Sequence, residues 1–355
     1  MGLRRERERD HALRRANGLA ENLVPSFRVL DGTVQAGKLP ILSRLRLLRL
    51  SITDRCNFRC RYCMPAEGVP KAGHSEILSL ETLAELVGWL GLRTGIDRVR
   101  LTGGEPLVRR GIESLIANLS AIPEIHEVCL TTNGSLLPGM AQSLKKAGLS
   151  RVNVSLDSLD KERFTAISRG GSLQRTLAGI EAAQAAGLTP IKLNTVLHRS
   201  TWRDDVPRLL DYAADTGFEI RFIELMRTGT ERAWCESEFI SVDEVRSELG
   251  AEVIQLAENN ITPARRTQMN WRGMNLTVGW ISPRSHRFCD TCERLRMDAR
   301  GRIRRCLMDA STLDLHHLLE TADAREAWAD FAGYLAGKVP PVAMDSALAM
   351  SQIGG

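Results

Sequence analysis

Strands and helices alternate along the middle of this chain, and that alternation limits the possible folds more than any other feature. Predicted strands lie at residues 45–52, 96–102, 127–131, 152–156, 191–197 and 219–225. Helical patterns separate them at residues 80–94, 111–119, 136–147, 173–186 and 205–216. Such alternation implies a parallel sheet with right-handed crossovers. Six units fall short of a closed eight-unit barrel, so we predict an α/β fold with a partial (β/α)6 barrel of the TIM type.

The segments on either side of this barrel have different patterns. Residues 1–44 are rich in arginine and glutamate, and we expect a basic extension that is partly disordered. We assign residues 45–265 to the barrel and residues 266–355 to a C-terminal region. Beyond the sixth strand, the patterns predict a helix at 242–249, strands within 262–281 and one or two helices within 312–335.

Composition excludes several classes of protein. The 355 residues are 43% hydrophobic, which suits one large or two medium globular domains. No run of about 18 apolar residues predicts a transmembrane helix, and the first residues lack the apolar core of a secretory signal. A net charge of +5 with 5% aromatic residues suits small anionic ligands better than nucleic acid. We therefore expect a cytoplasmic protein without membrane or nucleic-acid partners.

The first cysteine group directly follows the first predicted strand. Cys56, Cys60 and Cys63 have the spacing C-x₃-C-x₂-C. Thiolates are natural ligands for iron–sulfur clusters, and three of them would leave one iron of a [4Fe–4S] cube open. A structural zinc site normally has four ligands in paired units. Because sites in βα folds lie at the carboxyl ends of the strands, we expect functional residues at that edge.

A second group consists of Cys289, Cys292 and Cys306, with the spacing C-x₂-C-x₁₃-C. A zinc knuckle with His286 as fourth ligand is one interpretation; a second three-cysteine [4Fe–4S] cluster is the one we favour. Arg294 and Arg296 lie between these cysteines. In a strand, alternate residues share a face, so two guanidinium groups placed in this way can bind phosphates in a bidentate manner.

Polar residues also follow or interrupt other predicted strands. Gly103-Gly104-Glu105-Pro106 follows the second strand, and the glycines would allow close approach of a ligand or simply form a tight turn. Residues 131–134 and 155–157 are polar strand ends, which are either turn residues or parts of a shared pocket. Lys192 lies within the fifth strand, where burial is costly unless it meets an anion. An edge or interior position for Lys192 is the alternative.

The pattern C-x₃-C-x-aromatic-C, with Tyr62 as the aromatic residue, resembles the signature of radical S-adenosylmethionine (SAM) enzymes. The Gly-Gly-Glu-Pro segment is similar to a second element of that superfamily. This resemblance implies that Cys56, Cys60 and Cys63 hold a [4Fe–4S] cluster whose open iron chelates SAM. One electron would then cleave SAM to a 5′-deoxyadenosyl radical.

Two three-cysteine groups flanking six βα units resemble the GTP 3′,8-cyclases, the molybdenum cofactor biosynthesis protein A family, from about residue 49 to residue 306. The resemblance implies SAM contacts from Tyr62, Gly104, Ser155 and Met226. It implies GTP contacts from Arg49, Arg100, Thr131, Lys192, Arg294, Leu295 and Arg296. The second cluster, on Cys289, Cys292 and Cys306, would bind the guanine base through its open iron, and the final Gly354-Gly355 matches the family's ending.

The activity implied is a lyase-type cyclisation, the first step of molybdenum cofactor (molybdopterin) biosynthesis. The radical would remove hydrogen from C3′ of GTP, and the C3′ radical would attack C8. Reduction would then give (8S)-3′,8-cyclo-7,8-dihydroguanosine 5′-triphosphate. The implied catalytic residues are Cys56, Cys60, Cys63, Arg294 and Arg296. Implied partners are a flavodoxin or ferredoxin as electron donor, cyclic pyranopterin monophosphate synthase as recipient of the product, and a second copy in a homodimer.

Two residues depart from the family pattern. Glu293 occupies the place of a usual asparagine and would either repel phosphate or face away, and Arg287 replaces a more typical neutral residue. Two other functions stay open at this point. One is a radical SAM enzyme that modifies a peptide and uses the second group as an auxiliary cluster. The other is a non-catalytic metal-binding module associated with RNA through its basic arm.

Overall fold

The computed structural model describes residues 40–70, 72–73, 76–228, 231–250, 252–254, 264–341, 345–346 and 350. Most of the predicted extension at 1–44 and the terminal Gly354-Gly355 pair lie outside the described residues. Among the described residues, no helix is long and apolar enough to cross a membrane.

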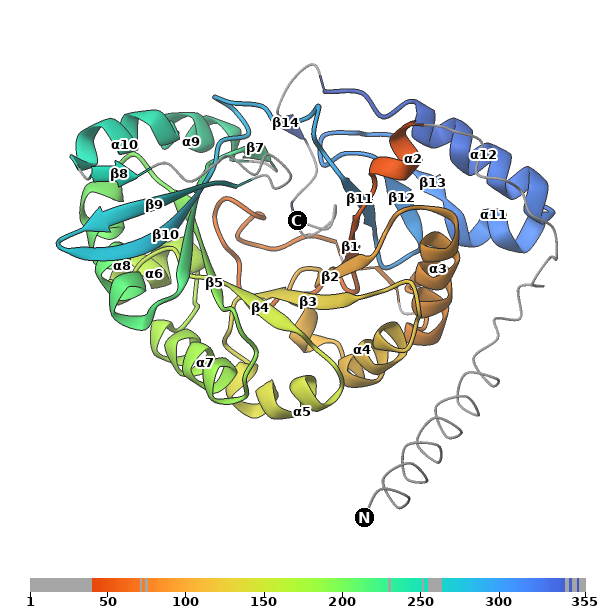
Figure 1. Ribbon diagram of the computed structural model, residues 1–355, viewed down its shortest axis with the longest axis horizontal. Helices are drawn as coiled ribbons and strands as arrows, with labels where there is room; N and C mark the ends of the chain where they lie inside the picture. The colour runs from red at the N-terminus through yellow and green to blue at the C-terminus, as the bar shows by residue number, and fades with distance from the viewer. Residues whose placement is uncertain are drawn as a thin grey trace, which may run out of the picture.

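Six parallel strands form the centre of the molecule, as predicted. They are β1 (Leu47–Ser51), β2 (Arg98–Thr102), β3 (Glu127–Thr132), β4 (Arg151–Ser155), β5 (Lys192–Leu197) and β6 (Glu219–Glu224), side by side in that order. The helices α3 (Leu80–Arg93), α4 (Ile112–Ser120), α5 (Ala141–Lys146), α7 (Leu173–Ala185) and α8 (Trp202–Thr216) cover the outer face of the curved sheet (Figure 1). The partial barrel is therefore confirmed.

Residues along these strands alternate between an apolar and a polar face. Leu48, Leu101 and Val154 point to the helices and are fully buried. Their neighbours Arg49, Arg100 and other polar residues share the opposite, inner face, because successive side chains of a strand point to opposite sides. This alternation packs the helices on one side of the sheet and lines the other side with polar groups.

The C-terminal region adds strands to both edges of this sheet instead of forming a separate one. On one edge, β10 (Met274–Ile281) pairs parallel with β6, followed by antiparallel β9 (Arg265–Trp271) and β8 (Glu252–Ile254). On the other edge, β11 (Arg294–Met297) pairs parallel with β1, followed by antiparallel β12 (Arg302–Arg304) and β13 (Leu313–Asp314). These strands satisfy the backbone groups that an open six-stranded sheet would leave unpaired. Our domain boundary at residue 265 stays a prediction.

Several helices differ from the sequence-based prediction. The predicted helix at 136–147 divides into a 3₁₀ turn, η3 (Leu137–Gly139), and α5, because Pro138 and Gly139 interrupt it. The short helix α6 (Lys161–Ser168), whose first turn is capped by Asp160, was not predicted; nor was α9 (Arg232–Ser237).

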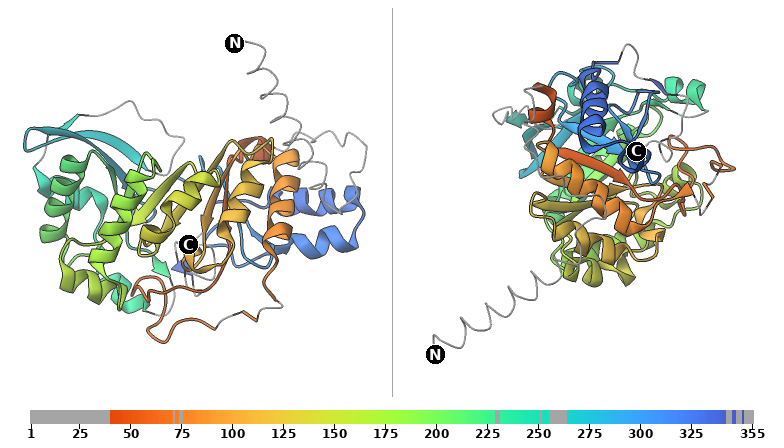
Figure 2. Two further views of the ribbon diagram at one scale, coloured as in Figure 1. Left: turned by 90° about the horizontal axis from the view of Figure 1, so that it is seen from below. Right: turned by 90° about the vertical axis from the view of Figure 1, so that its right-hand side faces the viewer.

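The predicted helix at 242–249 is confirmed as α10 (Val242–Leu249). The region 312–335 contains α11 (Leu315–Thr321) and α12 (Ala324–Ala336), which lie at the end of the molecule opposite β9 and β10 (Figure 2). Phe331 of α12 packs edge-on against Trp89 of α3, with ring centroids 5.2 Å apart. The late segment β14 (Asp345–Ser346) pairs with β7 (Arg227–Thr228), and the Met350 N–H donates to the Cys63 carbonyl at 3.0 Å. Met350 therefore lies against the first cysteine loop.

Candidate active site

The two cysteine groups lie at opposite ends of the parallel strands, one at the carboxyl edge and one at the amino edge of the sheet. Cys56 follows the carboxyl end of β1, whereas Cys289 and Cys292 precede the amino end of β11, which is parallel to β1. Cys306 follows β12, which is antiparallel to β11 and so ends where β11 begins. We expected functional residues at the carboxyl ends of the strands. The structure corrects this expectation, because β11 pairs in parallel with β1 and so places the second cysteine group at the amino ends of the strands.

Two glycines bring the end of β2 against the first cysteine loop. The Gly104 N–H donates to the Thr53 carbonyl and the Glu105 N–H to the Arg55 carbonyl, each at 2.8 Å. A Cβ atom at Gly104 would stand 2.4 Å from the Arg55 carbonyl oxygen. Any side chain at this position would push the loop away. The Gly-Gly pair therefore has a structural reason to be glycine, besides the SAM contact that we predict for Gly104.

The first group offers three thiols that are free of disulfides. Burial raises the pKa of Cys56 to about 11. Burial, together with Cys63, Asp157 and Cys56, raises the pKa of Cys60 well above its ordinary value. Partly buried thiols within electrostatic reach of one another are costly to ionise alone, as the raised pKa values of Cys56 and Cys60 show, but binding to iron removes that cost. This donor set fits the predicted [4Fe–4S] cluster.

Tyr62 of the same loop is fixed from two directions. Its hydroxyl donates to Oδ2 of Asp157 at 2.8 Å, and its carbonyl accepts a hydrogen bond from Thr228 Oγ1 at 3.2 Å. Asp157, which follows β4, also accepts from the Val196 N–H at 2.9 Å, and burial raises its pKa to about 6. The sequence analysis noted the polar end of β4 but did not assign this role to Asp157.

A second polar network supports the loop from the ends of β2 and β3. Buried Glu105 accepts hydrogen bonds from Thr132 Oγ1 at 2.7 Å and the Asn133 N–H at 2.8 Å. The Asn133 amide donates to Asn57 of the cysteine loop at 2.8 Å. Asn57 in turn donates to Ser135 Oγ at 2.9 Å. The predicted pocket of strand-end residues is therefore a scaffold that orients the cysteine loop.

A row of arginines crosses the inner face between the two cysteine groups. Arg49 on β1 is in register with Arg100 on β2 and with Arg296 on β11. Burial, and then Arg296, Arg100 and Arg294, lower the pKa of Arg49, and burial followed by Arg294 lowers that of Arg296 to about 10. Neighbouring cations that repel one another form a binding site for a multivalent anion, because the anion would relieve their repulsion.

Several buried polar atoms of this face also have no hydrogen-bond partner among the described residues. Among them are Nε of Arg100 and Oγ1 of Thr131. Because buried polar groups are normally satisfied, these atoms are available to a polar ligand. Both residues were predicted to bind substrate.

Lys192 lies at the amino end of β5, where an ion-pair network surrounds Glu219. Lys192 Nζ is 3.1 Å from Glu219, and Arg221 Nε and Arg266 Nη2 each lie 2.7 Å from the same carboxylate. Burial, and then Arg221, lower the pKa of Lys192 to about 8 despite Glu219. Lys192 therefore lines the interior of the barrel, one of our alternatives, and there it also meets an anion, the carboxylate of Glu219.

Two arginines that were not predicted, Arg151 and Arg221, share the inner face with the predicted cations. Arg151 forms a 2.6 Å ion pair with Glu127 on the neighbouring strand. Strict alternation of polar and apolar residues in 151–155 and 219–222 was the available signal.

The second cysteine group lies among cations. Burial alone would raise the pKa of Cys292. The positive charges of Arg294 and Lys338 outweigh burial, so the pKa of Cys292 is lowered to about 7. The guanidinium of Arg294 lies 5.0 Å from the centroid of the Phe288 ring. Cys289 is within electrostatic reach of Cys306 and Cys292. A stabilised thiolate between two neighbours suits an iron–sulfur ligand set.

The alternative zinc knuckle fits less well. His286 Nε2 is bonded to the carboxylate of Asp243. Within the described ranges, no three His, Cys, Asp or Glu side chains gather closely enough to hold one metal ion. In a four-iron cube each thiolate binds a different iron, so its cysteines need not converge on a single point.

Both residues that depart from the family pattern have partners in the structure. The Glu293 carboxylate lies 3.4 Å from Nη2 of Arg98, and its carbonyl accepts from the N–H groups of Arg46 and Leu47. Arg287 donates to the Pro341 carbonyl at 3.1 Å. The Glu293 carboxylate thus already has a cationic partner, and its effect on GTP binding stays a prediction.

The remaining predicted contacts have varied positions. Ser155 ends β4 and Met226 follows β6, both at the carboxyl edge that carries the first cysteine loop. Leu295 is fully buried in the apolar core, on the face of β11 opposite to Arg294 and Arg296. Only the backbone of Leu295 can therefore contact a ligand on the inner face.

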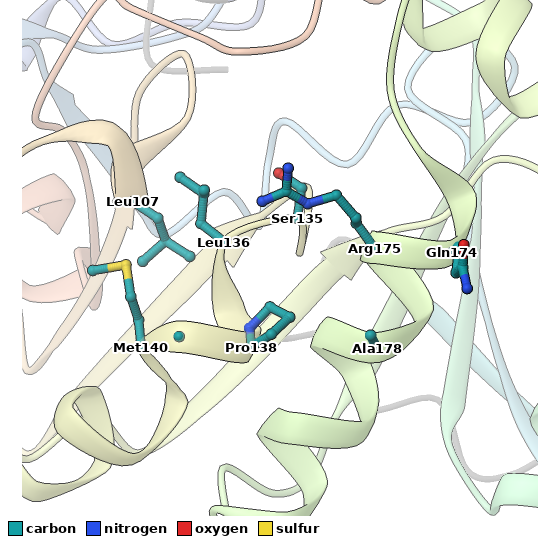
Figure 3. A pocket seen from close by; sticks show the side chains of 9 residues that line it. Leu107, Ser135, Leu136, Pro138, Met140, Gln174, Arg175 and Ala178 are labelled. Carbon is teal, nitrogen blue, oxygen red and sulfur yellow. The ribbon is translucent and has the colours of Figure 1, made fainter.

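A cavity of about 640 Å³ lies outside this site, between η3 and α7 (Figure 3). Leu107, Leu136 and Met140 line one side, and Arg175 and Ala178 line the other. It contains none of the predicted cofactor or substrate residues.

Comparisons with known proteins agree with this geometry. A family model described as the radical SAM superfamily matches residues 50–213, and one described as Molybdenum Cofactor Synthesis C matches residues 218–338. The crystal structure of Streptococcus suis SuiB bound to S-adenosylmethionine has a TM-score of 0.54 at 13% identity, over 81% of this chain and 64% of that chain. That likeness supports the fold.

Closer relatives identify the family. The GTP 3′,8-cyclase of Peptoclostridium acidaminophilum is 46% identical over 274 residues, which are 77% of this chain and 83% of the relative. The GTP 3′,8-cyclase of Moorella thermoacetica is 43% identical over 319 residues, which are 88% of this chain and 98% of the relative. With this identity along nearly the full length of a relative, the chain belongs to the GTP 3′,8-cyclase family of radical SAM proteins.

Proposed function

We propose that this chain is a lyase-type radical SAM enzyme that cyclises GTP to (8S)-3′,8-cyclo-7,8-dihydroguanosine 5′-triphosphate, the first step of molybdenum cofactor biosynthesis. The observation that carries the proposal is the arrangement of its inner face. Two three-cysteine groups lie at opposite edges of the same parallel strands, and Arg49, Arg100 and Arg296 lie in register between them. A nucleotide triphosphate placed between the edges would meet cations along its length.

The residues at each edge fit the groups that they would hold. Cys56, Cys60 and Cys63 would bind the first [4Fe–4S] cluster, and Cys289, Cys292 and Cys306 the second. Tyr62, Gly104, Ser155 and Met226 lie at the carboxyl edge and would contact SAM. When bound, the first cluster and SAM supply a 5′-deoxyadenosyl radical that removes hydrogen from C3′ of GTP.

The inner face would position the substrate and neutralise its charge. Arg294 and Arg296 are adjacent to the second cysteine group and would bind GTP while its base lies at that edge. Arg49, Arg100 and Lys192 would bind the triphosphate, and Thr131 offers an unpaired hydroxyl. Holding the base and ribose rigidly brings C3′ and C8 of one molecule together, so bond formation between them needs orientation more than acid–base chemistry.

The reaction needs electrons from outside the chain. One electron cleaves SAM, and a second, with a proton, reduces the radical that forms on the base after C3′ bonds to C8. A flavodoxin or ferredoxin is the donor that we propose, and cyclic pyranopterin monophosphate synthase would receive the product. We also propose a homodimer and a cytoplasmic location, where a reducing environment suits eight free cysteines.

The test is formation of 5′-deoxyadenosine by anaerobically reconstituted protein with SAM and reductant, in the presence of GTP, ATP or no nucleotide. We expect rapid formation with GTP alone, together with a product of the mass of cyclised dihydro-GTP. No cleavage of SAM by protein with full iron content would refute the proposal.

A peptide-modifying radical SAM enzyme is the rival function, and it would cleave SAM equally with or without nucleotide. An extra cysteine near the second group would favour this rival. The two cysteines outside the groups, Cys129 and Cys235, are instead buried in β3 and α9. The same assay therefore distinguishes the two functions.

A further inference from the structure

The carboxyl end of α12 is fastened to the loop that carries Cys306. The Tyr334 hydroxyl lies 3.1 Å from the Ile303 carbonyl and 3.0 Å from the Ser311 carbonyl. Arg305 of this loop also contacts Tyr334. Its Nη1 donates to the Tyr334 carbonyl at 3.2 Å, and its guanidinium lies 4.6 Å from the Tyr334 ring centroid. The helix end and the cysteine loop therefore form one unit.

This attachment brings a lysine to the second cysteine group. At Gly337 a Cβ atom would stand 2.1 Å from Nη1 of Arg305, so the absence of a side chain lets the chain pass close by. The next residue, Lys338, turns inward and donates from Nζ to the carbonyl of Arg305, the residue directly before Cys306. Its ammonium group lies within electrostatic reach of the thiols of Cys292 and Cys306.

A cation at this place acts on whatever the three thiols hold. A [4Fe–4S]²⁺ cluster with three thiolates carries a net negative charge and becomes more negative on reduction. A nearby ammonium group stabilises the reduced form more than the oxidised form, and net charge and hydrogen bonding around the sulfurs are known to set cluster potentials. Without Lys338, the cations left to offset the thiolate charge would be Arg294 and Arg296. We assign those two arginines to substrate binding.

We propose that Lys338 is a positioning residue of the second cluster, which anchors the Cys306 loop and raises the reduction potential of the cluster through its charge. This inference rests on the proposed assignment of Cys289, Cys292 and Cys306 as cluster ligands. The proposal assigns a role in the second site to a residue outside the two cysteine motifs. Lys338 follows closely on α12, a helix that packs on the exterior of the molecule.

The experiment uses the full chain with the first group replaced, Cys56→Ala, Cys60→Ala and Cys63→Ala, so that only the second cluster assembles. The potential of this parent is measured by anaerobic redox titration followed by electron paramagnetic resonance. Added Lys338→Met should lower the ratio of reduced to oxidised cluster at a fixed potential about tenfold, equivalent to about 59 mV for one electron. Added Lys338→Arg should keep the parent's value.

Lys145→Met is the matched control, because Lys145 Nζ also donates to a backbone carbonyl, that of Gly187 at 2.7 Å, but lies on α5. It should titrate like the parent. Should Lys338→Met fail to assemble a cluster, Lys338→Gln keeps a donor without the charge and supplies the measurement. A cluster in either variant with the parent's potential overturns the proposal. A parent that binds no iron refutes the ligand assignment itself, before Lys338 is changed.

Discussion

Arg49 on β1 lies directly beside Arg296 on β11, in register on two parallel strands that come from opposite ends of the described chain. Arg100 takes the corresponding place on the other side of Arg49. Burial and mutual repulsion make this row unfavourable in the absence of an anion, since they lower the pKa of Arg49 and Arg296. The arrangement is therefore understandable as a site prepared for a highly charged substrate.

Replacing Arg296 tests that interpretation. We expect Arg296→Ala to retain iron content and SAM binding and to lose GTP-dependent turnover by about 100-fold, because the substrate is misplaced between the two edges. SAM binding is measured by calorimetry, and turnover by 5′-deoxyadenosine and cyclised product. Arg203→Ala removes an arginine whose ion pair with Glu248 lies on the exterior, and it should behave as the unmodified protein. Unchanged turnover in Arg296→Ala would remove this residue from the site.

Glu105 predicts a pH dependence of stability. Burial raises its pKa from 4.5 to about 7 in the folded chain. Between these pH values the folded state keeps a proton that the unfolded state has lost, so the free energy of unfolding falls as the pH rises. Above pH 7 the loss reaches about 3 kcal/mol. The cluster-free protein should therefore melt at a higher temperature at pH 5 than at pH 8.

The variant Glu105→Gln isolates this contribution. It removes the titrating group, so the decrease in melting temperature between pH 5 and pH 8 should be smaller by on the order of 5 °C. Scanning calorimetry across this range measures the difference. Glu113→Gln, on the outer helix α4, serves as the control and should retain the full slope. Equal slopes in Glu105→Gln and the unmodified protein would contradict the assignment.

Glu224 at the end of β6 anchors the segment that leads to the second cysteine group. Its carboxylate accepts from the Val242 N–H at 3.1 Å and from the N–H groups of Arg284 and Ser285 at 2.9 and 3.0 Å. The Ser285 hydroxyl donates to it as well. Because an amide cannot accept all these bonds, Glu224→Gln should cost about 2 kcal/mol of stability.

The same variant should also lose iron selectively. Since residues 284–285 precede Cys289, loosening them should lower occupancy of the second cluster while the first cluster remains. Iron content and melting temperature are measured together. Glu236→Gln alters an exposed ion pair of the same Arg284, 2.8 Å long, and should change neither quantity appreciably. Retention of both clusters in Glu224→Gln would mean that the anchor does not control the second site.

The fold and the cysteine groups were predictable because their signals are local. Alternating patterns predicted six of the barrel strands, and C-x₃-C-x₂-C needs no partner to be noticed. The pairing of Arg294 and Arg296 on one face also followed from strand periodicity alone. Local chemistry likewise explains the main helix error, since Pro138 and Gly139 interrupt the predicted helix.

Other features depend on contacts between distant segments. That β11 pairs with β1, and so places Cys289 and Cys292 at the amino edge, follows from tertiary register and from no pattern near either strand. Lys338 reaches the Arg305 carbonyl, next to Cys306, because Tyr334 and Arg305 fasten α12 to the cysteine loop. Such relationships become visible only when the strands and helices are placed in space.

Glu293 carries a negative charge directly beside Arg294, which we assign to the substrate. Its carboxylate instead pairs with Arg98 at 3.4 Å, and both side chains are partly exposed. An exposed pair of this kind contributes about 0–1 kcal/mol, so Glu293→Asn should change the KM for GTP by less than about fivefold in steady-state assays. Arg98→Ala, which removes the other partner, helps to separate pairing from direct repulsion. A much larger fall in KM for Glu293→Asn would show that the carboxylate repels the substrate despite Arg98.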